Sequence, residues 1–193
     1  MNKRSRAAAA GFFIVVGAIV FLLASDAGKL AAQPTSGPAR STHGNWSEVA
    51  WPFPLDQWGT GRAFVCPAAS CGGKVELYLR PKLAFCNCTT GVSDDAELDR
   101  VGDLELLSPT FHGLRDGRPI AVGWMSGRSR PFEVSPRFAP ARTALAVAFN
   151  DKCDVVVATV VAERHFLASA EAAALEFLNR DLVLRWVEKE LGL

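Results

Sequence analysis

Apolar and polar positions alternate with a period of two in several short stretches of this chain, which predicts strands with one buried face. The clearest example is KVELYLR at 74–80, where every second side chain is apolar. RAFVC at 62–66 precedes it, and the loop between them contains Pro and Gly, so the two stretches are predicted to form a hairpin. A third strand is predicted at 82–86, after the break expected at Pro81.

Two further hairpins are predicted in the second half of the chain. Residues 119–125 and 130–135 lie on either side of the turn-forming sequence SGRS. Residues 143–149 and 153–162 lie on either side of Asn-Asp-Lys, which is a good hairpin tip. Because the stretch at 153–162 is almost wholly apolar, we expect this strand in the centre of the sheet.

Two other stretches follow the period of a helix. A short helix is predicted at 94–101, because Asp94 and Glu97 have the spacing of a capping box. Residues 169–193 are the strongest helical stretch, with apolar side chains at every third or fourth position, and the sequence NRD within it predicts a break into two helices. Strands followed by terminal helical structure indicate an α+β fold, with a mostly antiparallel sheet and a C-terminal amphipathic helix.

The N-terminal segment is apolar over residues 7–24, and basic side chains precede this run at positions 3, 4 and 6. A helix of this length is about 27 Å long, close to the hydrocarbon thickness of a bilayer. The basic cluster favours a cytoplasmic N-terminus. We therefore predict that residues 1–24 form a transmembrane helix, a single-pass anchor in the inner membrane that leaves the domain in the periplasm. A cleaved signal peptide is the alternative, and it would also export the domain.

Residues 25–45 are rich in Gly, Pro, Ser, Thr and Ala, which is the composition of a flexible linker. The exported α+β domain is predicted at 46–193. Its first residues, 46–58, contain four aromatic side chains and two prolines. We interpret them as an extended segment that packs its aromatic rings onto the domain. An aromatic surface at the membrane interface is the alternative.

The formal net charge of +1 hides an asymmetry along the chain. The three basic residues before the apolar run account for it, because the rest of the chain has 18 basic and 20 acidic side chains. Nucleic-acid binding depends mainly on neutralising phosphates. A slightly acidic domain therefore argues against a nucleic-acid partner.

Four cysteines form two clusters, Cys66-x4-Cys71 and Cys86-x-Cys88. We prefer structural disulfides, because an exported chain meets an oxidising compartment. A bridge from Cys86 to Cys88 would close a strained ring, so pairing between the two clusters is expected. Cys153 is expected to be a lone buried thiol, with an intermolecular crosslink as the alternative.

A metal site is the second interpretation of the same four cysteines. Four thiolates can bind Zn²⁺ in a tetrahedron, and these soft ligands would also suit Cu(I). His112 and His165 are candidate additional ligands. Thiol redox chemistry is a third and weaker interpretation, because the sequence lacks the setting that stabilises a thiolate. Apart from such a metal, no cofactor is expected.

Six arginines lie within residues 115–142, where acidic residues are few. Arginine side chains on hairpin loops can bind a carboxylate or phosphate through two hydrogen bonds. Arg128 and Arg130 are the candidate contacts for a partner or an anion. The alternatives are pairing with the acidic segment at 94–105, contact with anionic lipid, and a solvated surface.

These patterns favour a membrane-anchored periplasmic accessory or binding domain, stabilised by disulfides, that docks on a larger membrane or periplasmic protein. The alternative function is metal binding through Cys66, Cys71, Cys86 and Cys88. An enzyme is the least favoured class, because the sequence contains neither a nucleophile elbow nor a Gly-rich phosphate loop.

Overall fold

The computed structural model describes residues 45–137 and 140–193. The predicted membrane helix and all of the predicted linker except Asn45 lie outside these ranges. Among the helices that are described, none is both long enough and apolar enough to cross a bilayer.

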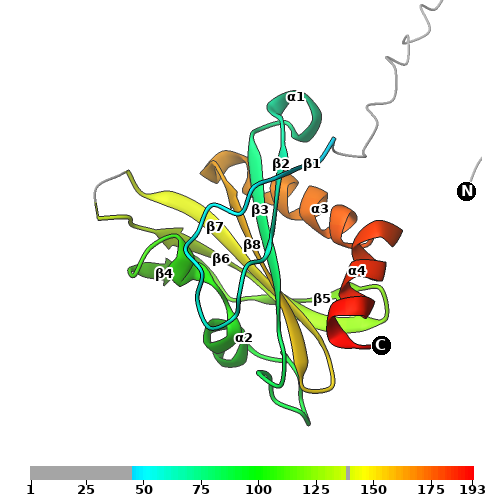
Figure 1. The fold of residues 1–193 in the computed structure, drawn as a ribbon. Coiled ribbons are helices and arrows are strands. Elements are labelled where there is room, and N and C mark those ends of the chain that lie inside the picture. Colours follow the sequence, from blue (N-terminus) through cyan, green and yellow to red (C-terminus); the bar gives the residue numbers. More distant parts are fainter. Residues whose placement is uncertain (1–44, 138–139) are drawn as a thin grey trace, which may run out of the picture. The chain divides into compact units, whose positions relative to one another are not determined.

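Eight strands of the described chain form one antiparallel sheet, shown in Figure 1. Seven of them lie side by side in the order β1-β2-β3-β8-β7-β6-β4, and β5 pairs with β6. Their bounds are β1 Ser47–Val49, β2 Arg62–Cys66, β3 Val75–Lys82, β4 Phe111–Gly113, β5 Arg118–Val122, β6 Met125–Val134, β7 Arg142–Asp151 and β8 Asp154–Ala162. The predicted α+β fold with an antiparallel sheet and C-terminal helices is confirmed.

The helices cover both faces of the sheet. The two C-terminal helices, α3 and α4, pack on one face, and α2 packs on the other (Figure 1). The helical elements are α1 Ala68–Cys71, α2 Asp95–Val101, the 3-10 turns η1 Leu104–Leu106 and η2 Arg164–Phe166, α3 Leu167–Leu178 and α4 Asp181–Leu191. The predicted break in the C-terminal helix is confirmed between α3 and α4, and the predicted helix at 94–101 is confirmed as α2.

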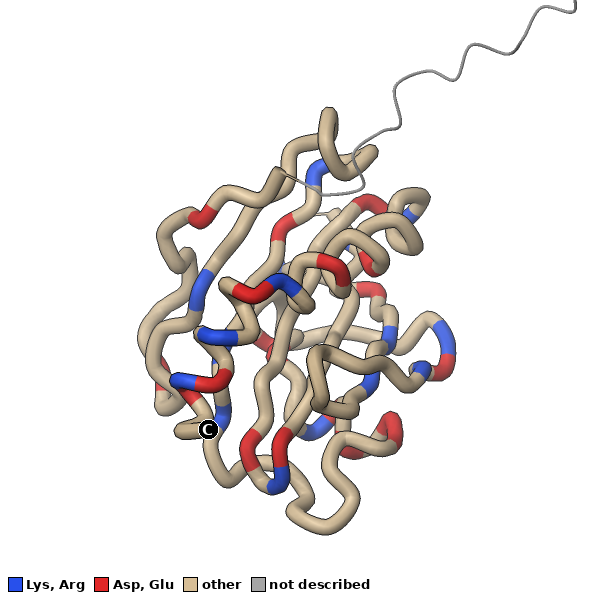
Figure 2. Tube along the Cα trace, turned by 90° about the vertical axis from the view of Figure 1, so that its right-hand side faces the viewer, with Lys and Arg blue, Asp and Glu red and all other residues tan. Residues whose placement is uncertain are grey.

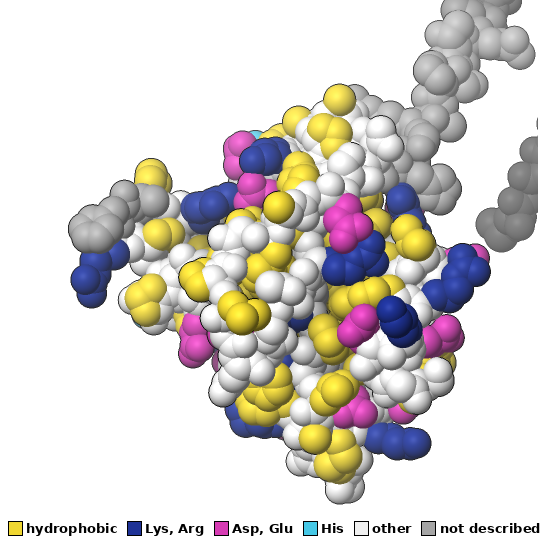
Figure 3. All heavy atoms as spheres, in the orientation of Figure 1, with side chains coloured by type: hydrophobic (Ala, Val, Ile, Leu, Met, Phe, Trp, Pro, Cys, Tyr) yellow, Lys and Arg dark blue, Asp and Glu magenta, His cyan; other side chains and the backbone are white. Residues whose placement is uncertain are grey.

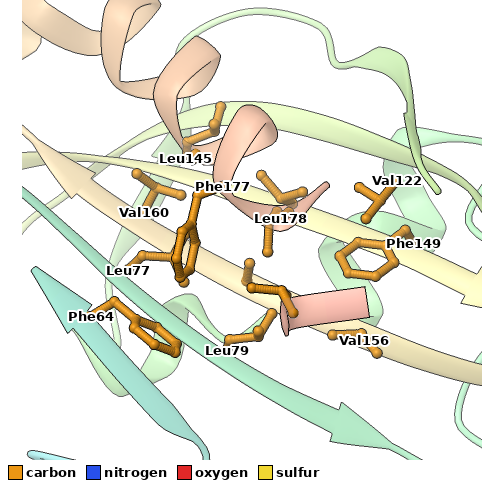
Figure 4. Packing of buried hydrophobic residues seen from close by; sticks show 14 of the residues in the cluster. Phe64, Leu77, Leu79, Val122, Leu145, Phe149, Val156, Val160, Phe177 and Leu178 are labelled. Carbon is orange, nitrogen blue, oxygen red and sulfur yellow. The ribbon is translucent and has the colours of Figure 1, made fainter. Parts of the chain in front are cut away.

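Each face of the sheet has its own apolar core. Figure 4 shows the larger one, where Phe177 and Leu178 of α3 meet strand residues such as Leu77 and Leu145. The second core lies under α2, where Leu98 and its neighbours meet the opposite face of the strands. Each buried side chain of this size contributes about 1.5–3 kcal/mol of transfer free energy. β8 is buried on both faces and lies between β3 and β7, as its apolar sequence predicts.

The predicted strand at 82–86 is not formed. Instead β3 continues through Pro81 to Lys82, and a turn follows. The pairing of β2 with β3 ends at Leu79, so β3 has a partner on one side only at Pro81. A proline without a backbone N–H is tolerated where a strand has a free edge.

The hairpin at 118–134 is confirmed, but its turn is not at SGRS. The turn is at Gly123 and Trp124, where Gly123 has a positive φ of 57°. SGRS lies inside β6, where Gly127 allows close packing, since a Cβ there would meet the carbonyl oxygen of Ala148 at 2.1 Å. Small residues at this site therefore permit close strand approach and do not mark a turn.

The aromatic segment packs onto the domain, as interpreted from the sequence. It contacts both faces of the sheet, because Trp46 stacks on Phe177 of α3 while the later rings pack against Tyr78 and Phe85. These contacts connect the first described residues to both cores. The ring pairs are Trp46–Phe177, Trp51–Phe53, Trp51–Tyr78, Phe53–Tyr78 and Trp58–Phe85.

Candidate functional site

Four of the five cysteines form two disulfides, Cys66–Cys71 and Cys88–Cys153. The expected pairing between the two sequence clusters is wrong, and so is the expectation that Cys153 is unpaired. Residues 68–71 form the single turn α1, which brings the first pair of sulfurs together locally. The chain after β3 runs beside the β7–β8 tip, which brings Cys88 to Cys153.

Cys86 is the unpaired cysteine and is buried. Its backbone N–H donates to the Cys153 carbonyl at 3.1 Å, and its thiol donates to the Lys152 carbonyl at 3.2 Å. Burial raises the pKa of the Cys86 thiol, and the nearby Glu97 and Asp154 carboxylates raise it further. A protonated, buried thiol is a poor nucleophile and a poor metal ligand.

The predicted four-cysteine metal site is not formed. Three of its sulfurs are in disulfides and cannot bind a metal as thiolates, and Cys86 alone remains. In the described ranges, no three His, Cys, Asp or Glu side chains are grouped so as to bind a metal ion. His112 lies on β4 and His165 in η2, and neither belongs to such a group.

A buried cluster of charges was not predicted from the sequence. Arg80 and Lys82 lie on the α2 side of β3, and Asp103 lies just after α2. The side chains of these three residues are 3%, 4% and 7% exposed. Asp103 bridges both cations, at 2.7 Å from Arg80 Nε and 2.7 Å from Lys82 Nζ. The signal in the sequence was the position of both cations on the face of β3 opposite its apolar side chains.

The aromatic segment closes this cluster from outside. Asp56 accepts from Arg80 Nη1 at 2.8 Å, and the Trp58 ring lies 5.5 Å from Lys82 Nζ. Burial lowers the pKa of Lys82, and Asp103 offsets this only in part. Burial raises the pKa of Asp56, but hydrogen bonds from Arg80 and the Trp58 backbone outweigh it and lower the pKa overall. The cluster is therefore a paired, structural network.

Arg128 and Arg130, the arginines singled out from the sequence, are paired inside the domain. Arg128 Nε contacts the Asp95 carboxylate, and Arg130 Nη1 lies 2.5 Å from Asp99 Oδ2. The two arginine side chains are 18% and 19% exposed. Both carboxylates belong to α2, so these pairs connect α2 to β6. This arrangement matches the alternative of pairing with the acidic segment.

The exposed cations lie elsewhere, around a hollow at one end of the sheet. This hollow of about 430 Å³ lies where β6 and β8 end and β3 and β7 begin. Its rim includes Lys74, Arg142 and Arg164, whose side chains are 64%, 51% and 71% exposed. Val161 and Ala162 are its apolar part. A second hollow of about 310 Å³ beside the start of α3 shares Arg164 and His165 with it. We call the two together the end groove.

The carboxylates of the end groove differ in exposure, and Glu76 is the recessed one. Glu76 is 17% exposed and receives both Lys74 at 2.7 Å and Arg142 at 3.2 Å. Burial raises the pKa of Glu76, but the hydrogen bond from Lys74 and the charge of Lys74 and Arg142 outweigh it, so the pKa is lowered. Arg164 lies 3.5 Å from Glu133. In the view of Figure 2, basic and acidic residues are interspersed along the described part of the chain. Figure 3 shows the same mixture, with apolar patches between charged side chains.

The comparisons with known proteins do not assign a family. No protein-family model matches the sequence, and no curated protein matches it. Solved structures similar to this chain include the following two. One is a Pseudomonas aeruginosa protein of unknown function, PA94, with 14% identity, a TM-score of 0.41, and coverage of 70% of this chain and 95% of that one. The other is LpqN, involved in cell envelope biogenesis of Mycobacterium tuberculosis, with 15% identity, a TM-score of 0.37, and coverage of 72% of this chain and 82% of that one.

Proposed function

We propose that this protein is an extracytoplasmic docking domain tethered to the inner membrane by residues 7–24. The two disulfides support an oxidising compartment, because such bonds persist outside the cytoplasm. The apolar run and the basic residues before it support the tether. A tether restricts the domain to the vicinity of the membrane and so raises its effective concentration near membrane-bound partners.

The end groove is the observation that carries the docking role. It is open, it combines exposed cations with an apolar part, and its ion pairs are solvent-exposed. Exposed ion pairs contribute only about 0–1 kcal/mol. Arg142 and Arg164 can therefore exchange their present partners for groups on another protein at little cost. Arg128 and Arg130 lack this freedom, since each is paired with a carboxylate of α2.

Photo-crosslinking in the native membrane tests the docking role. A photoreactive amino acid at Ala141, an exposed residue that lines the first hollow beside Arg142, is expected to give one discrete adduct with a partner protein. The same amino acid at Lys189 on α4, which is exposed and outside the groove, is the matched control. Arg164→Glu should abolish the Ala141 adduct, and Arg185→Glu on α4 should leave it intact. An adduct that persists in Arg164→Glu would contradict docking through the groove.

Membrane extraction tests the tether separately. The full chain is expected to stay in the membrane fraction at alkaline pH, and its intact mass should include residues 1–24. A chain that is released, or whose mass lacks the apolar run, would contradict the anchor while leaving export intact.

A further inference from the structure

The end groove holds more positive charge at its surface than its own carboxylates neutralise. In the first hollow, Glu76 is shared by Lys74 and Arg142. Beside the second hollow, Glu171 is 5% exposed and is shared by Arg115 and Arg118, whose side chains are 58% and 54% exposed. Glu76 and Glu171 therefore each serve two exposed cations. With Arg164, Glu133 and Glu163 included, the region has five cations and four carboxylates, a surplus of one positive charge.

The arginines that line the groove are loosely bound. Arg142 lies 3.2 Å from its carboxylate, Arg164 lies 3.5 Å and Arg115 lies 3.6 Å from theirs. For comparison, Arg80 in the buried cluster makes contacts of 2.7 Å and 2.8 Å. Long, exposed ion pairs exchange with water and with other anions at little cost. Carboxylates from another molecule could accept charge-assisted hydrogen bonds from these arginines, because one side of each arginine side chain already lies against the domain.

The course of the groove favours a flexible chain as its occupant. The first hollow includes Glu76 and Val161, which lie on the α2 face of the sheet, and the second lies against Leu167 at the start of α3 on the opposite face. The groove therefore bends around the end of the sheet at η2. A flat bilayer surface cannot follow both hollows, but an extended peptide can.

The occupant also needs short apolar side chains between its acids. The first hollow has an apolar part at Val161 and Ala162, and the second has one at Leu114 and Leu167. The N-terminal part of this chain does not fit, because residues 25–44 contain one acidic side chain against two basic ones. The partner must therefore supply the acidic segment.

We infer that the end groove binds an extended acidic peptide segment of a partner protein, with carboxylates at Arg142, Arg164 and Arg115 and small apolar side chains between them. This inference rests on the proposed docking function and names the chemistry of the partner. It also identifies Glu163, which is 69% exposed at the rim, as a residue that opposes binding.

Fluorescence anisotropy with a labelled peptide of alternating Glu and Ala tests the inference. The protein is the full chain in nanodiscs of phosphatidylcholine. The peptide should bind, and high salt should weaken binding because exposed charges are screened. Arg142→Gln with Arg164→Gln should weaken binding by at least about tenfold, the equivalent of one charge-assisted hydrogen bond. Glu163→Gln should tighten it by a few-fold, and Arg185→Gln on α4 should leave it unchanged.

Three results would overturn the inference. The first is equal binding of a Lys and Ala peptide, and the second is unchanged affinity in the Arg142→Gln, Arg164→Gln variant. The third is evidence that the groove binds the membrane instead. In that case phosphatidylglycerol in the nanodisc would block peptide binding. It would also protect Lys74 from acylation more than it protects Lys152, which lies at the far end of the sheet. If no peptide binds but the Ala141 adduct still depends on Arg164, the peptide inference fails and docking stands. If both fail, the proposed function fails as well.

Discussion

The two ends of the sheet use the same kinds of side chain in opposite ways. At the end near the β7–β8 tip, Arg80 and Lys82 are buried under the aromatic segment and bound to Asp103, and the Cys88–Cys153 disulfide crosslinks distant parts of the chain. At the other end, Arg142 and Arg164 are exposed and loosely paired, and the nearby disulfide spans one turn.

The difference shows that burial and pairing, and not residue type, separate the cations that stabilise the fold from those available for binding. A buried cation without a partner is costly, so a folded domain pairs it fully. An exposed cation gains little from its partner and can exchange it. Four sets of substitutions test this comparison.

Replacing Asp103 should have the largest effect. Asp103→Asn leaves Arg80 and Lys82 buried with too little negative charge, and breaking a buried pair in this way costs about 3–5 kcal/mol. Urea denaturation would measure the loss in the free energy of unfolding. Asp99→Asn, which removes a more exposed carboxylate of α2, should cost far less. Equal losses would show that burial does not separate the two classes.

The two disulfides should also differ in their contribution. They join residues 65 and 5 positions apart. In the chain-entropy model, the disulfide that closes the longer loop stabilises the folded state by about 4 kcal/mol, and the one that closes the shorter loop by about 2 kcal/mol. The double variants Cys88→Ser, Cys153→Ser and Cys66→Ser, Cys71→Ser can be compared by urea denaturation. A larger loss from the shorter loop would contradict the view that the tip end is the more strongly constrained one.

Arg128 and Arg142 both belong to the arginine-rich stretch at 115–142, but truncating them should change the free energy of unfolding by different amounts. Arg128→Ala removes a charge-assisted contact between β6 and α2, for which about 1.5–3 kcal/mol is expected. Arg142→Ala removes an exposed pair at the end groove and should change the free energy of unfolding by no more than about 0.5 kcal/mol. Thermal unfolding of both variants under the same conditions would check this. If Arg128→Ala is as stable as the unmodified protein, Arg128 becomes a candidate binding residue again.

The smallest expected effect is a change in acid sensitivity. The Gly117 backbone N–H, together with Arg128, lowers the pKa of Asp95 below its ordinary value of 3.8. A carboxyl with a lowered pKa stabilises the folded state above pH 3.8, and this contribution is lost as the pH falls through the folded-state pKa. Asp95→Asn should therefore be less stable at neutral pH but lose stability less steeply below pH 3.8. Parallel curves would show that Asp95 does not titrate in this way.

Local patterns in the sequence predicted much of the fold. The alternation in 74–80, the apolar run at 153–162 and the capping residues before α2 each depend on neighbours within a few positions. β3 continues through Pro81 to Lys82 because it is paired there with β8 alone, and the SGRS sequence lies inside β6, where Gly127 packs closely on Ala148. Both outcomes depend on which strands are neighbours, which a local pattern does not contain.

The candidate site was harder to predict because it depends on contacts between distant segments. Arg128 and Arg130 were the candidate contacts for a partner, with pairing to the acidic segment at 94–105 as an alternative. In the fold, α2 brings Asp95 and Asp99 to them across more than 30 residues. Cys88 pairs with Cys153 because the chain after β3 lies beside the β7–β8 tip. Arg164 gave no signal, since its role comes from its place beside Arg142 at the end of the sheet.

One paired measurement tests the central claim most directly. The free energy of unfolding and the affinity for the Glu and Ala peptide are measured for Arg80→Met and for Arg164→Met. Arg80→Met should lose about 3–5 kcal/mol of stability and keep its peptide affinity while folded. Arg164→Met should keep its stability and bind the peptide about tenfold more weakly. If Arg164→Met is as destabilised as Arg80→Met, or binds the peptide unchanged, the division between fold-stabilising and binding cations is wrong.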